Sequence, residues 1–305
     1  MLPVPGGEEI AVIIPTLATV ERAPYLLAAI ESVTSQAGVR ALPIVLANGP
    51  NADPHLRSLL ARRRDLSLHT LDEPSLPAAI RAGRDLVATR FFSELDDDDL
   101  LLPGALAMRH ARMARGDRPD VVVSNGILRG FGMEELHITD IEDTERDPLR
   151  ALLERNWLLP GSALFRSDAI TPDVFAGMPK YLEWTYLGLA LALRFRIAFL
   201  AEPTVVHRTD LPFSMDRSIE CRIGRPGALD KLLSLPLPRD VSETIRGRIG
   251  EACHEASDVS RRERRWLDAW RWHLRSLYQR RGWRYLAYTR HLLPLARSAS
   301  ASELP

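Results

Sequence analysis

FFSELDDDDLLLP, residues 91–103, joins an apolar run to four consecutive aspartates and closes with a proline. Adjacent carboxylates repel one another, and aspartate favours neither a strand nor a helix interior. At the end of a buried strand, such a run has two explanations. It is either a solvated loop that caps the next helix, or a site for a hard divalent cation, which prefers oxygen ligands. Four carboxylates in a row favour the cation, because it offsets their mutual repulsion.

Strand and helix patterns alternate around this run. Short apolar runs predict buried strands at 10–16, 42–49, 66–71, 90–95 and 119–130. Helical spacing predicts helices at 21–38, 53–63, 75–88 and 103–114, the last with Pro103 in its first turn. This alternation predicts an α/β fold with a Rossmann-like, doubly wound, mostly parallel sheet. In such sheets ligands bind at the carboxyl ends of the strands, where the aspartates lie.

The rest of the chain is less regular up to about residue 215 and helical beyond it. An acidic loop is expected at 134–147, strands at 161–170 and 197–208, and a buried helix within 180–195. We therefore expect an α/β domain over 1–212, with halves of about 8–130 and 131–212, and a C-terminal helical region over 213–305.

Composition excludes several classes of protein. The 40 basic and 40 acidic residues give no net charge, so no overall field attracts nucleic acid. Cys221 and Cys253 are too far apart for a redox pair or a zinc half-site, which favours a reduced, cytoplasmic setting. The first residues do not resemble a signal peptide, and no apolar run reaches the roughly 18 residues of a membrane span. Peripheral contact with the inner face of a membrane stays open.

The C-terminal stretch is basic and aromatic. Residues 258–305 contain eleven arginines and four acidic residues. Trp266, Trp270, Leu274, Leu277 and Tyr278 recur at helical spacing. This apolar stripe is interpreted first as a surface that packs on the rest of the chain or forms a homodimer. Docking on a membrane surface is the second alternative, and nucleic-acid binding is the least favoured.

A cation held by a few carboxylates completes its coordination shell with substrate phosphates and water. Sugar nucleotides and nucleoside triphosphates are natural ligands of that kind. Neither a GxxxxGK[ST] nor a GxGxxG motif occurs in the chain, so the phosphate-binding loops of other nucleotide folds are absent from the sequence.

The motifs together resemble a known family. The order IIPT, IVLANG and AAIRAGRDLVATRFFSELDDDDLLLPGAL is similar to the nucleotide-binding half of a family-2 glycosyltransferase with the GT-A fold. The resemblance covers residues 10 to about 208 and continues more weakly through PGSALFR, KYLEWTYLGLALALRF and IAFLAEPTVVHR. The matching positions are Pro15, Thr16, Gly49, Ala78, Ala79, Gly83, Leu95, Asp96, Asp98, Asp99 and Pro103.

The resemblance implies an inverting, Mn²⁺- or Mg²⁺-assisted transferase. It would move a sugar from a nucleotide-diphosphate donor, most simply a UDP-sugar, to a hydroxyl of a glycan, lipid-linked or small-molecule acceptor. It also implies roles for individual residues. The metal ligands would be Asp98 and His207, the nucleotide-sugar contacts Pro15, Thr16, Asn48, Arg81, Asp96 and Asp97, the catalytic base Glu183, and the acceptor contacts Trp157, Gly161 and Ser162. Asp99 would cap the next helix or support the metal ligands.

Four departures from the family pattern keep alternatives open. Ala47-Asn48 replaces an acidic pair, Leu17-Ala18 replaces Tyr-Asn, Ile80-Arg81 replaces Arg-Asn, and Glu183-Trp184 replaces Glu-Asp. One alternative is a degenerate binding or scaffold subunit. The other is a nucleotidyltransferase, although LATVERAP is not the glycine-rich basic loop that this class requires after the first strand.

Overall fold

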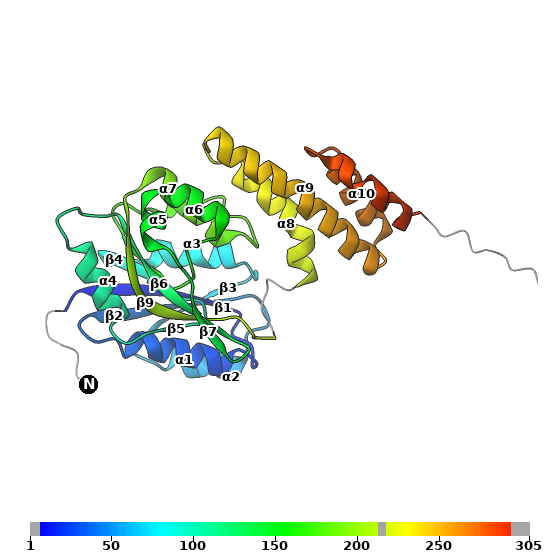
Figure 1. Cartoon of the computed structure of the whole chain (residues 1–305). Coiled ribbons are helices and arrows are strands. Elements are labelled where there is room, and N and C mark those ends of the chain that lie inside the picture. The colour runs from blue at the N-terminus through cyan, green and yellow to red at the C-terminus, as the bar shows by residue number, and fades with distance from the viewer. Residues whose placement is uncertain (1–6, 213–217, 294–305) are drawn as a thin grey trace, which may run out of the picture. The chain divides into compact units, whose positions relative to one another are not determined.

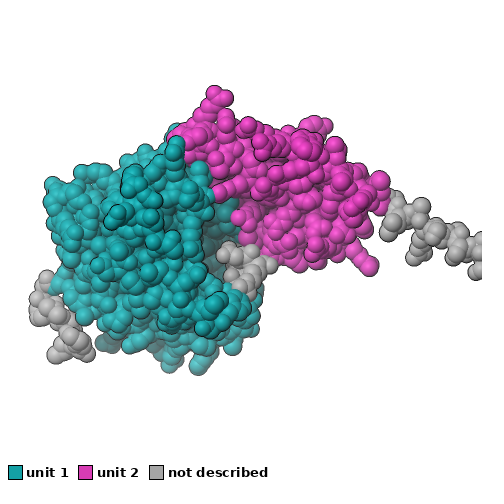
Figure 2. Space-filling view, in the orientation of Figure 1, with its two compact units in different colours: residues 1–214, 234–237 teal, residues 215–233, 238–305 magenta. Residues whose placement is uncertain are grey.

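The computed structural model describes residues 7–212 and 218–293 of the chain (Figure 1). The chain divides into two compact units, which Figure 2 shows in different colours. Unit 1 comprises residues 1–214 with 234–237, and unit 2 comprises residues 215–233 with 238–305. The expected boundary after residue 212 falls at the start of residues 213–217, which lie outside the described residues.

Unit 1 is built on one mixed sheet with the strand order β3-β2-β1-β4-β8-β6-β9-β5, and β7 pairs with β6. Strands β1 to β4, β6 and β9 point the same way, whereas β5, β7 and β8 run against them. The fold is therefore the mostly parallel α/β type that the sequence predicted. The strands are β1 Glu9–Thr16, β2 Arg40–Asn48, β3 Ser67–Leu71, β4 Phe91–Glu94, β5 Leu100–Leu101, β6 Val121–Gly130, β7 Met133–Leu136, β8 Ala163–Arg166 and β9 Ile197–Arg208.

Helices cover both faces of the sheet (Figure 1). Helices α1 (Ala23–Thr34), α2 (Pro54–Ala61) and α4 (Ala105–Met113) share one core with side chains of β1, including Val12 and Ile14. Helix α3 (Leu76–Leu86) packs on the other face, against Ile13 and Leu46. Strand β1 is almost wholly buried because strands flank it on both sides and helices cover both of its faces. That explains its uninterrupted apolar sequence.

The middle of unit 1 is more regular than its sequence suggests. The expected loop at 134–147 contains most of β7 and also helix α5 (Ile141–Arg146), which begins there because the Asp140 carboxylate accepts a hydrogen bond from the backbone N–H of Asp143. The chain continues through α6 (Pro148–Glu154), β8, the short 3-10 helix η1 (Pro172–Phe175) and α7 (Glu183–Arg194) into β9.

Helix α4 begins later than predicted. Pro103 lies before the helix rather than in its first turn, and Gly104 occupies the N-cap with φ of 76°. This left-handed conformation suits glycine, which has no Cβ. Gly104 offers no capping side chain, and Oε1 of Gln36 accepts a hydrogen bond from the backbone N–H of Leu106 at 3.2 Å. The Asp99 oxygens bond to His207 and Arg208 instead, so Asp99 does not cap the helix. Asp99 is therefore available for another role.

The described part of unit 2 is helical. It contains α8 (Ile219–Leu232), α9 (Arg239–Arg262), α10 (Trp266–Leu277) and the 3-10 helix η3 (Gly282–His291). Helix α10 buries small or polar side chains, Ala269, His273 and Ser276. The predicted stripe that starts at Trp266 lies toward the other side of the helix and is largely exposed or half-buried. No helix in the described residues is long and apolar enough to cross a membrane.

Candidate functional site

Two parallel strands bring the acidic run to the carboxyl edge of the sheet. Ile13 of β1 pairs with Glu94 of β4, so Thr16 and residues 96–99 follow their strands to the same edge. One carboxylate oxygen from each of Asp96, Asp98 and Asp99 lies within 4.8 Å of the other two. Such a cluster of oxygen atoms suits a hard divalent cation.

Asp97 does not belong to this cluster. It is 3% exposed, and its carboxylate accepts hydrogen bonds from the Thr16 hydroxyl and from the Arg22 guanidinium. Thr16 in turn accepts a hydrogen bond from the backbone N–H of Ala18 at 2.9 Å. The predicted contacts of Thr16 and Asp97 with a nucleotide stay predictions. Their polar atoms join the aspartate loop to the segment after β1.

Asp99 belongs to the cluster and also forms a hydrogen bond with His207. Its side chain is fully buried, and Oδ2 accepts a hydrogen bond from Nδ1 of His207 at 2.7 Å. The other oxygen, Oδ1, accepts a hydrogen bond from the backbone N–H of Arg208 at 3.0 Å. Burial alone would lower the pKa of His207. The negative charge and hydrogen bond of Asp99, together with Asp96 and Asp98, outweigh burial and raise this pKa to about 9.

In Asp96 and Asp98, the other two members of the cluster, the ionised form of the carboxyl group is disfavoured. Burial, followed by repulsion from Asp99 and Asp97, raises the pKa of Asp98 to about 6. Burial and the neighbouring Asp98 raise the pKa of Asp96 well above its usual value. A bound divalent cation would reverse these shifts by stabilising the ionised carboxylates. The donor set therefore fits a cation, with Asp96, Asp98 and Asp99 as candidate ligands.

Glu94 is a buried carboxyl that sequence reasoning missed. It is 4% exposed, and its Oε2 accepts a hydrogen bond from the backbone N–H of Gly161 at 3.2 Å. Burial and the charge of Asp96 raise its pKa well above the usual value. Its position in the strand directly before the aspartates was the available signal. Glu94 links the acidic loop to the segment that contains Gly161.

Two arginines flank the cluster. The Arg22 guanidinium lies 3.7 Å from Oδ2 of Asp98, and that of Arg208 donates to the backbone carbonyl of Asp98 at 2.7 Å. Arg208 also lies over the Tyr25 ring, 5.2 Å from its centre. Cationic side chains at this place can bind phosphate oxygens. Sequence reasoning passed over both, although Arg208 directly follows His207 at the end of a strand.

The predicted nucleotide contacts on β1, β2 and α3 have different surroundings. Pro15 is buried within β1. The amide of Asn48 donates to the backbone carbonyl of Thr16 at 3.0 Å and accepts from the backbone N–H of Ser75 at 3.2 Å, so it joins β1, β2 and the start of α3. Arg81 is exposed on α3. The base contacts of Asn48 and Arg81 stay predictions.

The predicted acceptor contacts are buried. Trp157 is 2% exposed, its Nε1–H donates to the carbonyl of Pro148 at 2.7 Å, and its ring meets Phe199 edge-on. The Ser162 hydroxyl donates to the carbonyl of Leu159 at 2.8 Å. Gly161 turns the chain with φ of 73°. These residues contribute to the core of unit 1, and their contacts with an acceptor stay predictions.

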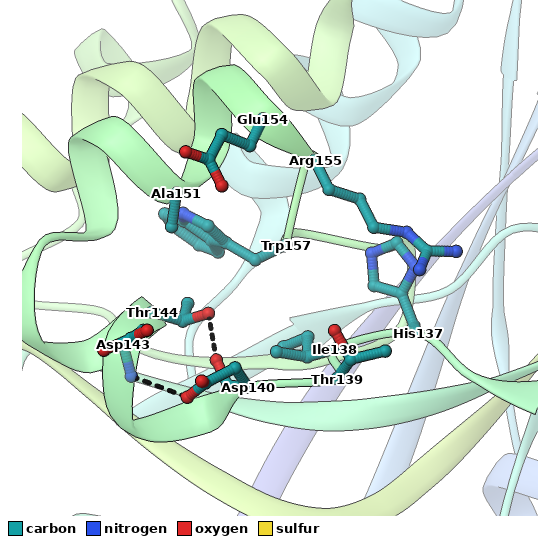
Figure 3. Close-up of a pocket in the computed structure, with 10 residues that line it drawn as sticks. All are labelled: His137, Ile138, Thr139, Asp140, Asp143, Thr144, Ala151, Glu154, Arg155 and Trp157. Carbon is teal, nitrogen blue, oxygen red and sulfur yellow. Dashed lines mark hydrogen bonds between the residues drawn. The ribbon is translucent and has the colours of Figure 1, made fainter.

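A pocket that is partly open to solvent lies in the half of unit 1 that contains Trp157 (Figure 3). It is lined by His137, Ile138, Thr139, Asp140, Asp143, Thr144, Ala151, Glu154, Arg155 and Trp157. His137 is 6% exposed, and its Nδ1 has no hydrogen-bond partner among the described residues. Burial lowers the pKa of His137 to about 4, and the charge of Arg155 lowers it further.

Glu183, the predicted base, is the first residue of α7 and is 7% exposed. Helix α7 ends at Arg194, three residues before β9 begins at the amino edge of the sheet. At 1.5 Å per residue, Glu183 lies about 17 Å along the helix from that end. This placement is compatible with a role at the opposite, carboxyl edge.

The sheet, its covering helices and the acidic carboxyl edge define an α/β fold of the GT-A type. Solved structures of TarS from S. aureus, a glycosyltransferase, share this fold. TarS 1–349 in complex with UDP-GlcNAc is 13% identical, with a TM-score of 0.55 and coverage of 83% of each chain. The same segment in complex with UDP is 14% identical, with a TM-score of 0.51 and coverage of 85% of this chain and 75% of that one.

A longer TarS structure is 14% identical with a TM-score of 0.54, and the match covers 81% of this chain but 43% of TarS. No protein-family model matches the sequence, and no curated protein matches it either. At this level of identity the likeness is one of fold.

Proposed function

We propose that the protein is a glycosyltransferase that uses a nucleotide-diphosphate sugar, most simply a UDP-sugar, with the help of Mn²⁺ or Mg²⁺. One observation carries the proposal. Oxygen atoms of Asp96, Asp98 and Asp99 converge within 4.8 Å at the carboxyl edge of a GT-A-type sheet. Similar folds belong to TarS structures that hold UDP-GlcNAc or UDP, which supports the choice of donor.

The donor half of the site would use residues on both sides of the cluster. Asp96, Asp98 and Asp99 would hold the cation, with His207 fixed beside them by Asp99. When bound, the cation would neutralise the charge that develops on the diphosphate leaving group. Arg22 and Arg208 flank Asp98 and are placed to bind diphosphate oxygens. Asn48 and Arg81 would contact the base from β2 and α3.

The acceptor half would supply a base and a binding surface. Glu183 would accept the proton of the attacking hydroxyl, and attack opposite the leaving group would invert the anomeric carbon. The pocket beside His137 would bind the acceptor, because its carboxylates, hydroxyls and Arg155 can form hydrogen bonds with a hydroxylated molecule. Trp157 would support this pocket from the core.

Turnover of a UDP-sugar panel by Asp98→Asn tests the proposal. The variant should release UDP at a rate roughly 100-fold or more below that of the wild type, because one ligand for the cation is lost. Asp168→Asn is the matched control, since the Asp168 side chain is 80% exposed and outside the cluster. Equal turnover by wild type and Asp98→Asn would contradict the proposed site. Metal-dependent UDP binding without any turnover would instead favour the binding-subunit alternative.

A further inference from the structure

Helices α10 and η3 of unit 2, with their flanking residues, expose side chains that are both apolar and basic. We define the α10–η3 surface by its exposed large apolar side chains and by four exposed arginines. The apolar side chains are Trp266 (49% exposed), Leu267 (89%), Leu274 (48%), Tyr278 (89%), Trp283 (72%), Leu286 (58%) and Leu293 (53%). The arginines are Arg264, Arg271, Arg281 and Arg290.

The apolar side chains are concentrated in this short stretch. Of the sixteen large apolar side chains that are exposed among the described residues, these seven fall between residues 266 and 293. On α10, Leu267, Leu274 and Tyr278 follow the i, i+7, i+11 spacing of one helical stripe. A stripe of exposed apolar side chains along one helix is typical of an interaction surface.

The opposite side of α10 is already occupied within unit 2. The carbonyl of Ala269 accepts a hydrogen bond from the Ser257 hydroxyl of α9 at 2.7 Å. His273 makes a 2.8 Å hydrogen bond with Thr289 of η3. The exposed stripe is thus not the face on which the helix folds, and its apolar side chains contribute little to the core of unit 2.

The positive charge around α10 and η3 indicates which kind of partner this surface would bind. Residues 264–293 contain eight arginines and one acidic residue, Asp268, a formal charge of +7. Within the described part of the chain, no carboxylate forms an ion pair with Arg264, Arg271, Arg281 or Arg290. An anionic partner would therefore meet several uncompensated guanidinium groups.

Two other partners fit less well. A twofold symmetric dimer through this surface would place the same positive stretch against itself, which costs electrostatic free energy. Nucleic acid would use the aromatic rings for base stacking. However, four of the seven exposed apolar residues are leucines, which do not stack on bases but do partition into hydrocarbon.

We propose that the α10–η3 surface docks on an anionic lipid membrane, with its leucine and aromatic side chains at the acyl boundary and its arginines among the headgroups. Interfacial helices of this composition gain from apolar burial and from attraction to anionic lipid together. Trp and Tyr also favour the membrane–water interface. The proposal concerns unit 2 alone and does not depend on the activity proposed for unit 1.

Vesicle flotation with the full chain tests this proposal. The protein should float with vesicles of phosphatidylcholine mixed with phosphatidylglycerol, less so as salt is raised, and should stay unbound with phosphatidylcholine alone. Arg264→Glu/Arg271→Glu should weaken binding by roughly tenfold or more. Leu267→Ser/Leu286→Ser should weaken it by a similar factor. Circular dichroism and thermal melting confirm that each variant is folded.

Matched controls lie elsewhere on the chain. Arg57→Glu/Arg246→Glu makes the same charge change at exposed positions on α2 and α9, and Leu59→Ser removes a leucine that is 45% exposed in unit 1. Both controls should bind vesicles like the wild type.

Four results would overturn the proposal. They are no binding to anionic vesicles, equal binding to neutral ones, equal loss in the controls, and unchanged binding by the α10–η3 variants. A dimer in light scattering that Leu267→Ser/Leu286→Ser abolishes would assign the surface to a second copy. Tight binding of a single-stranded oligonucleotide without vesicle binding would assign it to nucleic acid.

Discussion

Asp97 and Asp98 are neighbouring buried carboxyls with different partners. Burial raises the pKa of both, but for Asp97 the Arg22 guanidinium and the Thr16 hydroxyl act against it. The Asp97 carboxylate is buried and accepts hydrogen bonds from Thr16 and Arg22. Asp98 instead faces other carboxylates, and burial and their charges raise its pKa to about 6. A carboxyl whose pKa is higher in the folded than in the unfolded state favours folding most at low pH, and this contribution is lost as the pH rises through the folded value.

These surroundings predict the stability of two matched variants without divalent cations. Asp97→Asn should lower the free energy of unfolding by about 1–3 kcal/mol, because it weakens two buried charge-assisted hydrogen bonds. Asp98→Asn should raise it at pH 8 and change it little near pH 4, since the wild-type carboxyl is ionised at the first pH and mostly protonated at the second. Urea denaturation in EDTA measures both. A loss of stability in Asp98→Asn at pH 8 would contradict the account of the cluster.

At the scale of elements, helix α3 can lie against the sheet only because Gly83 has no side chain. A Cβ at this position would lie 2.4 Å from Cγ2 of Ile13 and 3.2 Å from Cδ2 of Leu46. The close approach holds α3 over β1 and β2, the strands that lead into the candidate donor site. Ser75, whose backbone N–H donates to Asn48, precedes the same helix.

Gly83→Ala should therefore destabilise unit 1 although alanine is the better helix former. Overpacking of a tight core typically costs about 1–3 kcal/mol, which exceeds the helix-propensity gain of roughly 1 kcal/mol. Thermal unfolding should show a lower melting temperature for this variant. Gly116→Ala is the control, because a Cβ there meets nothing within 4 Å. An unchanged or higher melting temperature for Gly83→Ala would show that α3 can move away without cost.

At the scale of the whole molecule, the charge is divided between the units. Unit 2 has 18 Lys and Arg against 11 Asp and Glu, a formal charge of +7, so unit 1 carries −7 in a chain whose total is zero. The net charge of zero is therefore the sum of two opposite charges, and the positive charge of unit 2 suits an anionic surface. In unit 1, the acidic cluster suits a cation.

Much of the fold followed from sequence because local patterns decided it. The buried run of β1 and the helix spacing of α1 and α3 act within a few residues, and the structure confirms the strand–helix alternation. The direction in which individual side chains point could not be predicted from the sequence. Thr16 meets Asp97 across 81 residues and Asp99 meets His207 across 108, and no local pattern states which of four adjacent aspartates turns inward.

The most direct test of the central claim is calorimetric titration of the protein with UDP, GDP and ADP, each in Mn²⁺ and in EDTA. The claim is that the carboxylates at the edge of the sheet hold a cation and, through it, a nucleoside diphosphate. We predict that UDP binds in Mn²⁺, that EDTA abolishes this binding, and that Asp98→Asn loses it while Asp168→Asn retains it. If no diphosphate binds, or if binding is the same in EDTA, the claim is contradicted.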